Sequence, residues 1–293
     1  MIGSREPAWL EQRERGSGWL MATIAQIALR LGRPAAAALL YPICTYFIVF
    51  STNARRASVA YLRRALGRGP TPADVFRHYL CFASTILDRV FLYAGHGARF
   101  HCEWRGLDTL REHLDAGRGC LLVGAHFGSF DMLRAVALAD GNARVRVLMH
   151  AERAAKMGAV LHRLDPRFPR QVIALGRPET MLDVRAALAA GEIVALLADR
   201  SLHGDRQVTC DFFGAPAHFP RGPFELAAML RVPVVLFCAT YRGAGHYVIR
   251  FDALDAANVD ARCRTFAGWL EARCREAPEN WFNFYDFWAK APA

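Results

Sequence analysis

Short apolar segments alternate with helical stretches after residue 100, and this alternation restricts the possible folds more than any other feature of the chain. Apolar strands separated by helices are typical of a parallel sheet that is covered by helices on both faces. We therefore predict an α/β fold with a mostly parallel sheet flanked by helices. The expected strands span 120–125, 145–150, 171–175, 193–198, 232–240 and 247–251, and the expected helices span 128–139, 151–163, 178–190, 222–230 and 258–276.

The first hundred residues are predicted to be helical and to hold two apolar runs. Residues 34–53 include no charged side chain, and a helix of 20 residues is long enough to cross a bilayer. The stretch from Arg15 to Ala73 holds eight arginines and no acidic residue, which suits an anionic membrane surface. We predict a membrane-associated helical region over 1–100 and an α/β domain over 101–293. A buried hairpin in a soluble helical domain is the alternative for the apolar runs.

The composition argues against several other classes of protein. The net charge is +10, but the basic residues lie among aliphatic runs rather than among spaced polar and aromatic side chains, so no nucleic-acid partner is expected. The eight cysteines form no CxxC pair and the ten histidines form no H-E-x-x-H pair, so we predict no metal site and no cofactor. Cysteines within apolar runs favour a reducing compartment that faces the cytosol.

A candidate catalytic pair, His126 and Asp131, follows the first strand of the predicted sheet. Sites in open α/β sheets form at the carboxyl ends of strands, and His126 lies directly after one. Of the ten histidines, only His126 has an acidic residue five positions later. A carboxylate on one ring nitrogen fixes the tautomer and leaves the other nitrogen basic near neutral pH. We therefore expect His126 to be a base that Asp131 orients. A strand-end histidine that only stabilises the fold is the alternative.

The residues around His126 indicate direct transfer rather than a covalent intermediate. A histidine–carboxylate pair can deprotonate a hydroxyl or an amine that attacks a thioester. Ser129 is close in sequence, but it lacks the G-x-S-x-G elbow of serine hydrolases, and we interpret it as a helix cap.

Several segments together resemble the lipid A biosynthesis (lauroyl/myristoyl) acyltransferases, a branch of the lysophospholipid-acyltransferase-like superfamily. The sequence GAHFGSFD around His126 is similar to that family's H-x4-[D/E] block, and Asp199 ends a helix–strand segment similar to one in the family. The sequences DFFG at 211–214, VPVV at 232–235 and PENW at 278–281 also match family elements in order and spacing. The resemblance covers roughly residues 100–290.

The resemblance implies an acyltransferase of the inner membrane whose active domain faces the cytoplasm. Its donor would be a fatty acyl thioester of acyl carrier protein or, as the lesser option, of coenzyme A, and its acceptor would be a lipid. The basic surface of this chain suits an acidic carrier protein. Helix N-termini attract anions, and Arg221 stands at the start of the helix predicted at 222–230. Arg221 is therefore a further candidate to bind a phosphate group of the substrate. The residues expected to contact substrate are His150, Arg153, Asp199, Arg200, Phe213, Gly214 and Arg221.

Two positions depart from the family pattern and leave the acceptor open. The family's Asp-Gln pair is Asp199-Arg200 here, and His150, with Arg153 nearby, stands where the family has an arginine. An N- or O-acyltransferase that acts on another acceptor, such as an amino-acid lipid or a polyene pigment lipid, is therefore an alternative. The F-P-E-G-T-R block of the glycerol-phosphate branch is not found, which argues against a glycerolipid acceptor. A catalytically silent membrane-binding scaffold is the alternative from a different class.

Overall fold

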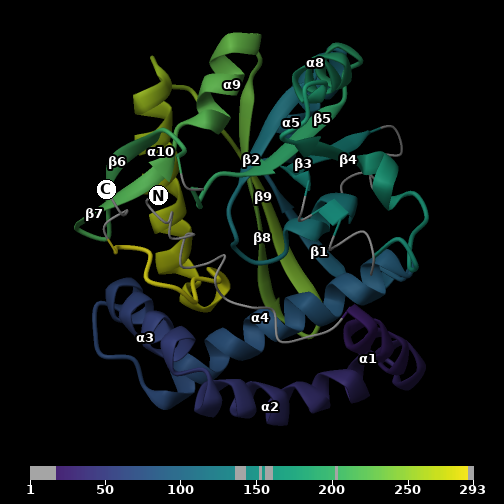
Figure 1. Cartoon of the computed structure of the whole chain (residues 1–293), viewed down its shortest axis with the longest axis vertical. Helices are drawn as coiled ribbons and strands as arrows, with labels where there is room; N and C mark the ends of the chain where they lie inside the picture. Colours follow the sequence, from purple (N-terminus) through teal and green to yellow (C-terminus); the bar gives the residue numbers. More distant parts are fainter. Residues whose placement is uncertain (1–17, 136–142, 152–153, 156–160, 202–203, 290–293) are drawn as a thin grey trace, which may run out of the picture.

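The N-terminal part of the chain is helical in the computed structural model, which describes residues 18–135, 143–151, 154–155, 161–201 and 204–289. The longest of these helices, α4, lies between the sheet and the other three (Figure 1). α4 therefore links the N-terminal helices to the rest of the molecule. The bounds are α1 (Gly18–Leu31), α2 (Arg33–Phe50), α3 (Thr52–Leu66) and α4 (Pro72–Tyr93).

α4 begins with Thr71, Pro72 and Asp74, residue types that are typical of a helix start. The Thr71 side chain accepts a hydrogen bond from the backbone N–H of Asp74 at 3.2 Å, and the Asp74 carboxylate accepts one from the backbone N–H of Thr71 at 2.8 Å. Pro72 fills the first helical position, where a missing N–H costs nothing. These contacts fix the start of the helix that later carries two residues of the site.

A seven-stranded sheet forms the centre of the molecule, in the order β1-β9-β8-β2-β5-β3-β4. All neighbouring pairs are parallel except β8 and β9, which form an antiparallel hairpin. The predicted fold, a mostly parallel sheet flanked by helices, is confirmed. The strands are β1 (His101–Arg105), β2 (Cys120–Gly124), β3 (Val145–His150), β4 (Val172–Leu175), β5 (Ile193–Leu197), β8 (Val234–Gly243) and β9 (His246–Ala253).

Both faces of the sheet are covered, which explains why its central strands are continuous apolar runs. All five residues of β2 are buried. Leu121 and Val123 belong to one core, shared with α8, α9 and α10, whereas Cys120 and Leu122 belong to a second core, shared with α5. The covering helices are α5 (Leu107–Asp115), α8 (Thr180–Ala189), α9 (Gly222–Leu230) and α10 (Val259–Glu276), and the short 3₁₀ turns are η1 (Gly97–Arg99), η2 (Phe130–Met132), η3 (Phe168–Gln171) and η4 (Pro278–Asn280).

A separate two-stranded hairpin, β6 (Gln207–Phe212) and β7 (Ala215–Pro220), packs against α10. Its two turn residues, Phe213 and Gly214, have φ angles of 57° and 71°. Positive φ at both central residues is the geometry of the tight hairpin turn that matches strand twist. The segment predicted to contact substrate at 213–214 is thus the tip of this hairpin.

Most of α2 faces outward. Only Ala36 and Cys44 of this helix are buried, although its side chains are largely apolar. It is long and apolar enough to cross a membrane, by length and composition. Its exposed large apolar residues are Leu39, Tyr41, Ile43, Tyr46, Phe47, Val49 and Phe50.

Candidate active site

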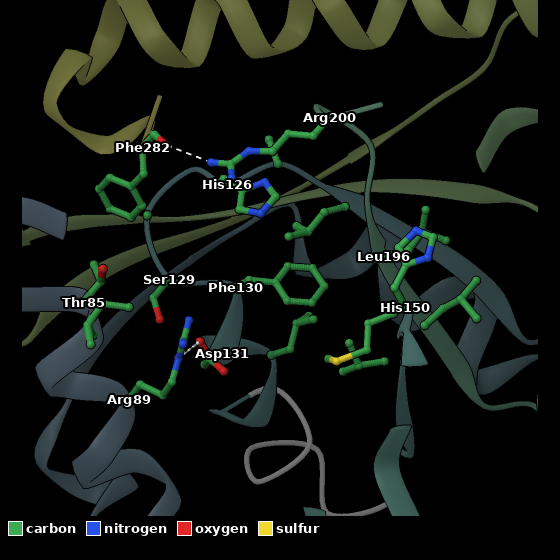
Figure 2. Close-up of a pocket in the computed structure, with 18 of the residues that line it drawn as sticks. Thr85, Arg89, His126, Ser129, Phe130, Asp131, His150, Leu196, Arg200 and Phe282 are labelled. Atoms are coloured by element: carbon green, nitrogen blue, oxygen red, sulfur yellow. Dashed lines mark hydrogen bonds and ion pairs between the residues drawn. The ribbon is translucent and has the colours of Figure 1, made fainter. Parts of the chain in front are cut away.

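A cavity of about 2540 Å³ lies beyond the carboxyl ends of β2 and β5, under α2 and α4. Polar side chains of the segments after these strands and of β3 line it, and Figure 2 shows His126, Asp131, His150 and Arg200 around it. Part of its apolar lining comes from the helices above. The apolar lining residues of α2 and α4 include Leu40, Ile43, Phe47, Phe82, Ile86 and Val90. One cavity therefore joins ionisable side chains to the helix that faces outward.

His126 pairs with Asp199 through its Nδ1 atom, which lies 2.8 Å from Asp199 Oδ1. The sheet register explains this meeting. β2 and β5 are parallel neighbours, and Gly124 pairs with Leu197 at their carboxyl ends. Continuing that register by two residues places His126 opposite Asp199. The two side chains therefore come from adjacent strand ends although 73 residues separate them in sequence.

Asp199 is ionised because its surroundings outweigh the cost of burying it. The side chain is 1% exposed, and burial alone would raise the pKa of this carboxyl. The charge and hydrogen bond of His126, the charge of Arg200 and the indole N–H of Trp281 together hold the pKa of Asp199 well below its usual range. An ionised carboxylate can only accept hydrogen bonds, so Nδ1 of His126 must carry the hydrogen of this pair.

Asp131, which the sequence predicts to orient His126, contacts α4 instead. Its Oδ2 accepts a hydrogen bond from Arg89 Nε at 2.6 Å, and its Oδ1 accepts one from the Tyr93 hydroxyl at 3.2 Å. Asp131 and Arg89 both line the cavity (Figure 2). The attraction of Asp131 outweighs burial and raises the pKa of Arg89. The carboxylate on His126 Nδ1 is therefore that of Asp199, and Asp131 fixes an arginine.

The path of the chain after His126 explains this arrangement. The predicted helix over 128–139 does not start at Gly128, which has a φ of 58° and lies so close to β8 that a Cβ atom would meet Ala239 O at 1.9 Å. Gly128 N–H donates to Asn280 O, and Ser129 N–H donates to Ala239 O. This loop, rather than a helix, carries the chain to η2 and turns Asp131 toward α4. Ser129 occupies the N-cap position of η2, as predicted, but its side chain makes no capping hydrogen bond.

The C-terminal segment holds the His126 loop from the other side. The backbone N–H of Phe282 donates to His126 O at 2.8 Å, and Arg200 Nη2 donates to Phe282 O at 2.9 Å. Trp281 Nε1 donates to Asp199 Oδ2 at 3.0 Å. The aromatic residues 281–288 are thus divided between the core and the site, because Phe282, Phe284 and Tyr285 line the cavity.

The remaining predicted substrate residues fall into three groups. His150, at the end of β3, and Arg200 line the cavity, and Arg200 also stacks on Tyr285. Arg221 forms ion pairs with Glu225 and Asp260 beside α9 and is not among the lining residues. Phe213 and Gly214 do not line the cavity either, and Arg153 lies outside the described residues.

The residues of the site that were not predicted from the sequence are Arg89, Tyr93 and Trp281. Arg89 and its neighbour Asp88 are the only charged residues between Tyr79 and Tyr93. A charged pair inside an otherwise apolar stretch of helix was the available signal, since charges are buried only with partners. For Trp281, the sequence feature that could have indicated a role in the site was its place in the Pro-Glu-Asn-Trp segment, which resembles a family element.

Comparison with known proteins identifies the family of the chain. Curated proteins gave no significant match to the chain. The model of the family described as bacterial lipid A biosynthesis acyltransferase matches residues 19–290, from α1 to the end of the aromatic segment. The match includes the helices above the cavity as well as the sheet below it. The chain therefore belongs to the bacterial lipid A biosynthesis acyltransferase family and is an acyltransferase.

Proposed function

We propose that this acyltransferase moves a fatty acyl group from a thioester of acyl carrier protein to a hydroxyl or amine of a lipid acceptor of the lipid A type. The observation that carries the proposal is the hydrogen bond from His126 to Asp199 at the wall of a cavity that α2 and α4 line with apolar side chains. A polar acid–base pair and an apolar space for acyl chains are the two parts that such a reaction needs.

His126 is the proposed base. With Nδ1–H donated to Asp199, the lone pair of the ring is on Nε2, which takes the proton of the acceptor as its oxygen or nitrogen attacks the thioester carbonyl carbon. The tetrahedral intermediate collapses, the C–S bond breaks, and the proton passes from the imidazolium to the leaving thiolate. The new ester or amide and a free thiol are the products, and His126 returns to its starting state.

Arg200 is the proposed stabiliser of the negative charge that develops on the carbonyl oxygen. Its guanidinium lines the cavity, acts on Asp199 through its charge and is held by the carbonyl of Phe282. A cation fixed before the reaction costs no reorganisation when the oxyanion forms. Arg89 also lines the cavity, and we propose that it binds an anionic group of the substrate. Its Nε–H donates to Asp131, which fixes the orientation of the guanidinium.

The N-terminal helices, within residues 1–100, are proposed to bind the cytoplasmic face of the inner membrane. α2 presents its apolar side chains outward and also lines the cavity with Ile43 and Phe47. A lipid acceptor would therefore pass from the bilayer to His126 along this helix. The eight arginines between Arg15 and Ala73, with no acidic residue among them, suit anionic headgroups.

Acyl transfer by purified protein tests this proposal. Wild type, His126→Ala and His218→Ala, a control histidine on the β6–β7 hairpin, are incubated in detergent with radiolabelled acyl–carrier protein and a total bacterial lipid extract. We expect labelled lipid with wild type and His218→Ala and none with His126→Ala. Equal labelling by a folded His126→Ala variant would remove His126 as the base.

The same assay separates the donors and the acceptors. Replacing acyl–carrier protein with the coenzyme A thioester measures donor preference. The mass of the labelled product identifies the acceptor. A labelled amino-acid lipid or pigment lipid would show that the acceptor is not of the lipid A type.

A further inference from the structure

The Asp199 carboxylate is held at both of its oxygens. Oδ1 lies 2.8 Å from His126 Nδ1, and Oδ2 lies 3.0 Å from Trp281 Nε1. Asp199 and Trp281 are each 1% exposed, so water does not compete for either contact. A carboxylate that is bound at one oxygen can still turn about its Cβ–Cγ bond, whereas one bound at both oxygens cannot. Trp281 thus restricts the carboxylate to an orientation in which Oδ1 faces His126.

Trp281 is itself fixed from several sides. Its ring packs edge-on against Tyr61 and Phe287, each with centroids 4.9 Å away. Its backbone carbonyl lies 2.9 Å from Nε2 of the buried His78 of α4. Its neighbours Asn280 and Phe282 bond to the backbone of the His126 loop, at Gly128 and at His126. The indole N–H is therefore presented to Asp199 by a segment that also holds the loop carrying the base.

We infer that Trp281 is a positioning residue for the acyl transfer, and that the working unit is Trp281–Asp199–His126 rather than a pair of residues. This inference rests on the proposed role of His126 as base. Trp281 has no contact with the cavity, because it is not among the lining residues, and it acts only through Asp199. The functional site therefore extends into the segment 279–289, which follows the sheet and belongs to none of its strands.

The indole N–H has two expected effects on His126. It keeps Oδ1 aligned with Nδ1, and it withdraws negative charge from the carboxylate. Arg200, which follows it, and the Cys274 thiol of α10 also act on Asp199. Without the N–H, the carboxylate attracts a proton on His126 more strongly and holds the ring less well. A residue that only filled space would produce neither effect.

The variant Trp281→Phe removes the N–H donor and keeps an aromatic ring. Trp288→Phe is the matched control, because Trp288 belongs to the same aromatic cluster and its Nε1 donates at 3.3 Å to a backbone carbonyl, that of Phe212, and not to Asp199. We expect Trp281→Phe to lower kcat by roughly tenfold or more with KM changed less than about twofold, as the loss of a hydrogen bond to a charged group implies. Its acid limb in a plot of kcat against pH should move to higher pH. Trp288→Phe should change neither.

A measurement without substrate separates this inference from the proposed function. The pH titration of His126, followed by ¹⁵N NMR in detergent and assigned with His126→Ala, should shift upward in Trp281→Phe and not in Trp288→Phe. If the wild type proves inactive with every donor, the proposed reaction fails while this titration still tests the positioning. A titration and a kcat in Trp281→Phe that equal those of Trp288→Phe would overturn the inference.

The wild-type protein supplies a second test in case Trp281→Phe does not fold. The indole N–H resonance of Trp281 should change with the same midpoint as the His126 titration, because both share one carboxylate, while that of Trp288 should not. A Trp281 resonance that ignores the titration of His126 would also overturn the inference.

Discussion

His126 and Asp199 stand at equivalent positions beyond the ends of two neighbouring parallel strands, with Nδ1 and Oδ1 2.8 Å apart. This relationship follows from strand register and not from proximity in sequence. Asp131, five residues after His126, faces Arg89 instead. The two carboxylates can therefore be told apart by experiment.

Asp199→Asn should lower kcat by about a thousandfold, because an amide does not stabilise the imidazolium and can hold the ring in the wrong tautomer. Asp131→Asn leaves the bond between His126 and Asp199 in place, so its kcat should fall by less than about tenfold if its role is to fix Arg89. Single-turnover rates at saturating donor measure both. The reverse ranking of the two variants would return the orienting role to Asp131.

The elements that could be predicted from the sequence are those whose apolar residue pattern matches their burial in the structure. The central strands are apolar on both faces, and β3 begins and ends where the sequence predicts, at Val145 and His150. β1 was missed because it is an edge strand whose residues alternate between exposed, as at His101, and half-buried, as at Cys102. The β6–β7 hairpin was missed because its turn uses Phe213, a residue that rarely adopts a positive φ.

The partner of His126 could not be predicted for a different reason. Local spacing offered Asp131, whereas the sheet order that sets β2 beside β5 depends on contacts between distant segments. The same holds for Trp281, whose contact with Asp199 spans 82 residues. His126 and Asp199 were both found as candidates from their places at strand ends, but their pairing needed the register.

Asp131→Asn should also reduce the stability of the folded state. It leaves the Arg89 guanidinium, whose side chain is 30% exposed, against a neutral partner. Breaking a fully buried pair costs more, so the partial exposure of Arg89 reduces the expected loss to about 1–3 kcal/mol of unfolding free energy. Denaturant melts in detergent measure this. Glu103→Gln, which breaks an exposed pair with Arg105, is the matched control and should cost less than about 0.5 kcal/mol. Equal losses in the two variants would contradict a special role for the Arg89 pair.

The buried His78 should make stability depend on pH. Burial lowers the pKa of His78 to about 4, despite its hydrogen bond with the Trp281 carbonyl. In the unfolded chain the group titrates near 6.5, so between about pH 6.5 and pH 4 the unfolded state binds a proton that the folded state does not. Stability should therefore fall as the pH is lowered through this window, by about 3 kcal/mol at its lower end, and should not change through this group above it.

The variant His78→Gln isolates this effect from those of other titrating groups. Glutamine does not titrate, so the difference in unfolding free energy between wild type and variant should shrink as the pH falls from 7 to 4.5. A difference that stays constant over this range would show that His78 does not take up the proton on unfolding.

The outward face of α2 should control membrane binding. Val49 is 52% exposed and does not line the cavity, so Val49→Glu places a charge on the proposed membrane face without touching the site. Loss of the buried apolar area together with the cost of a charge in the interface should reduce binding to vesicles of phosphatidylethanolamine and phosphatidylglycerol by roughly tenfold or more. Vesicle flotation measures the bound fraction. Leu182→Glu, at a 67% exposed leucine of α8, is the matched control and should bind like wild type. If both variants lose binding equally, or if Val49→Glu binds like wild type, α2 is not the membrane face.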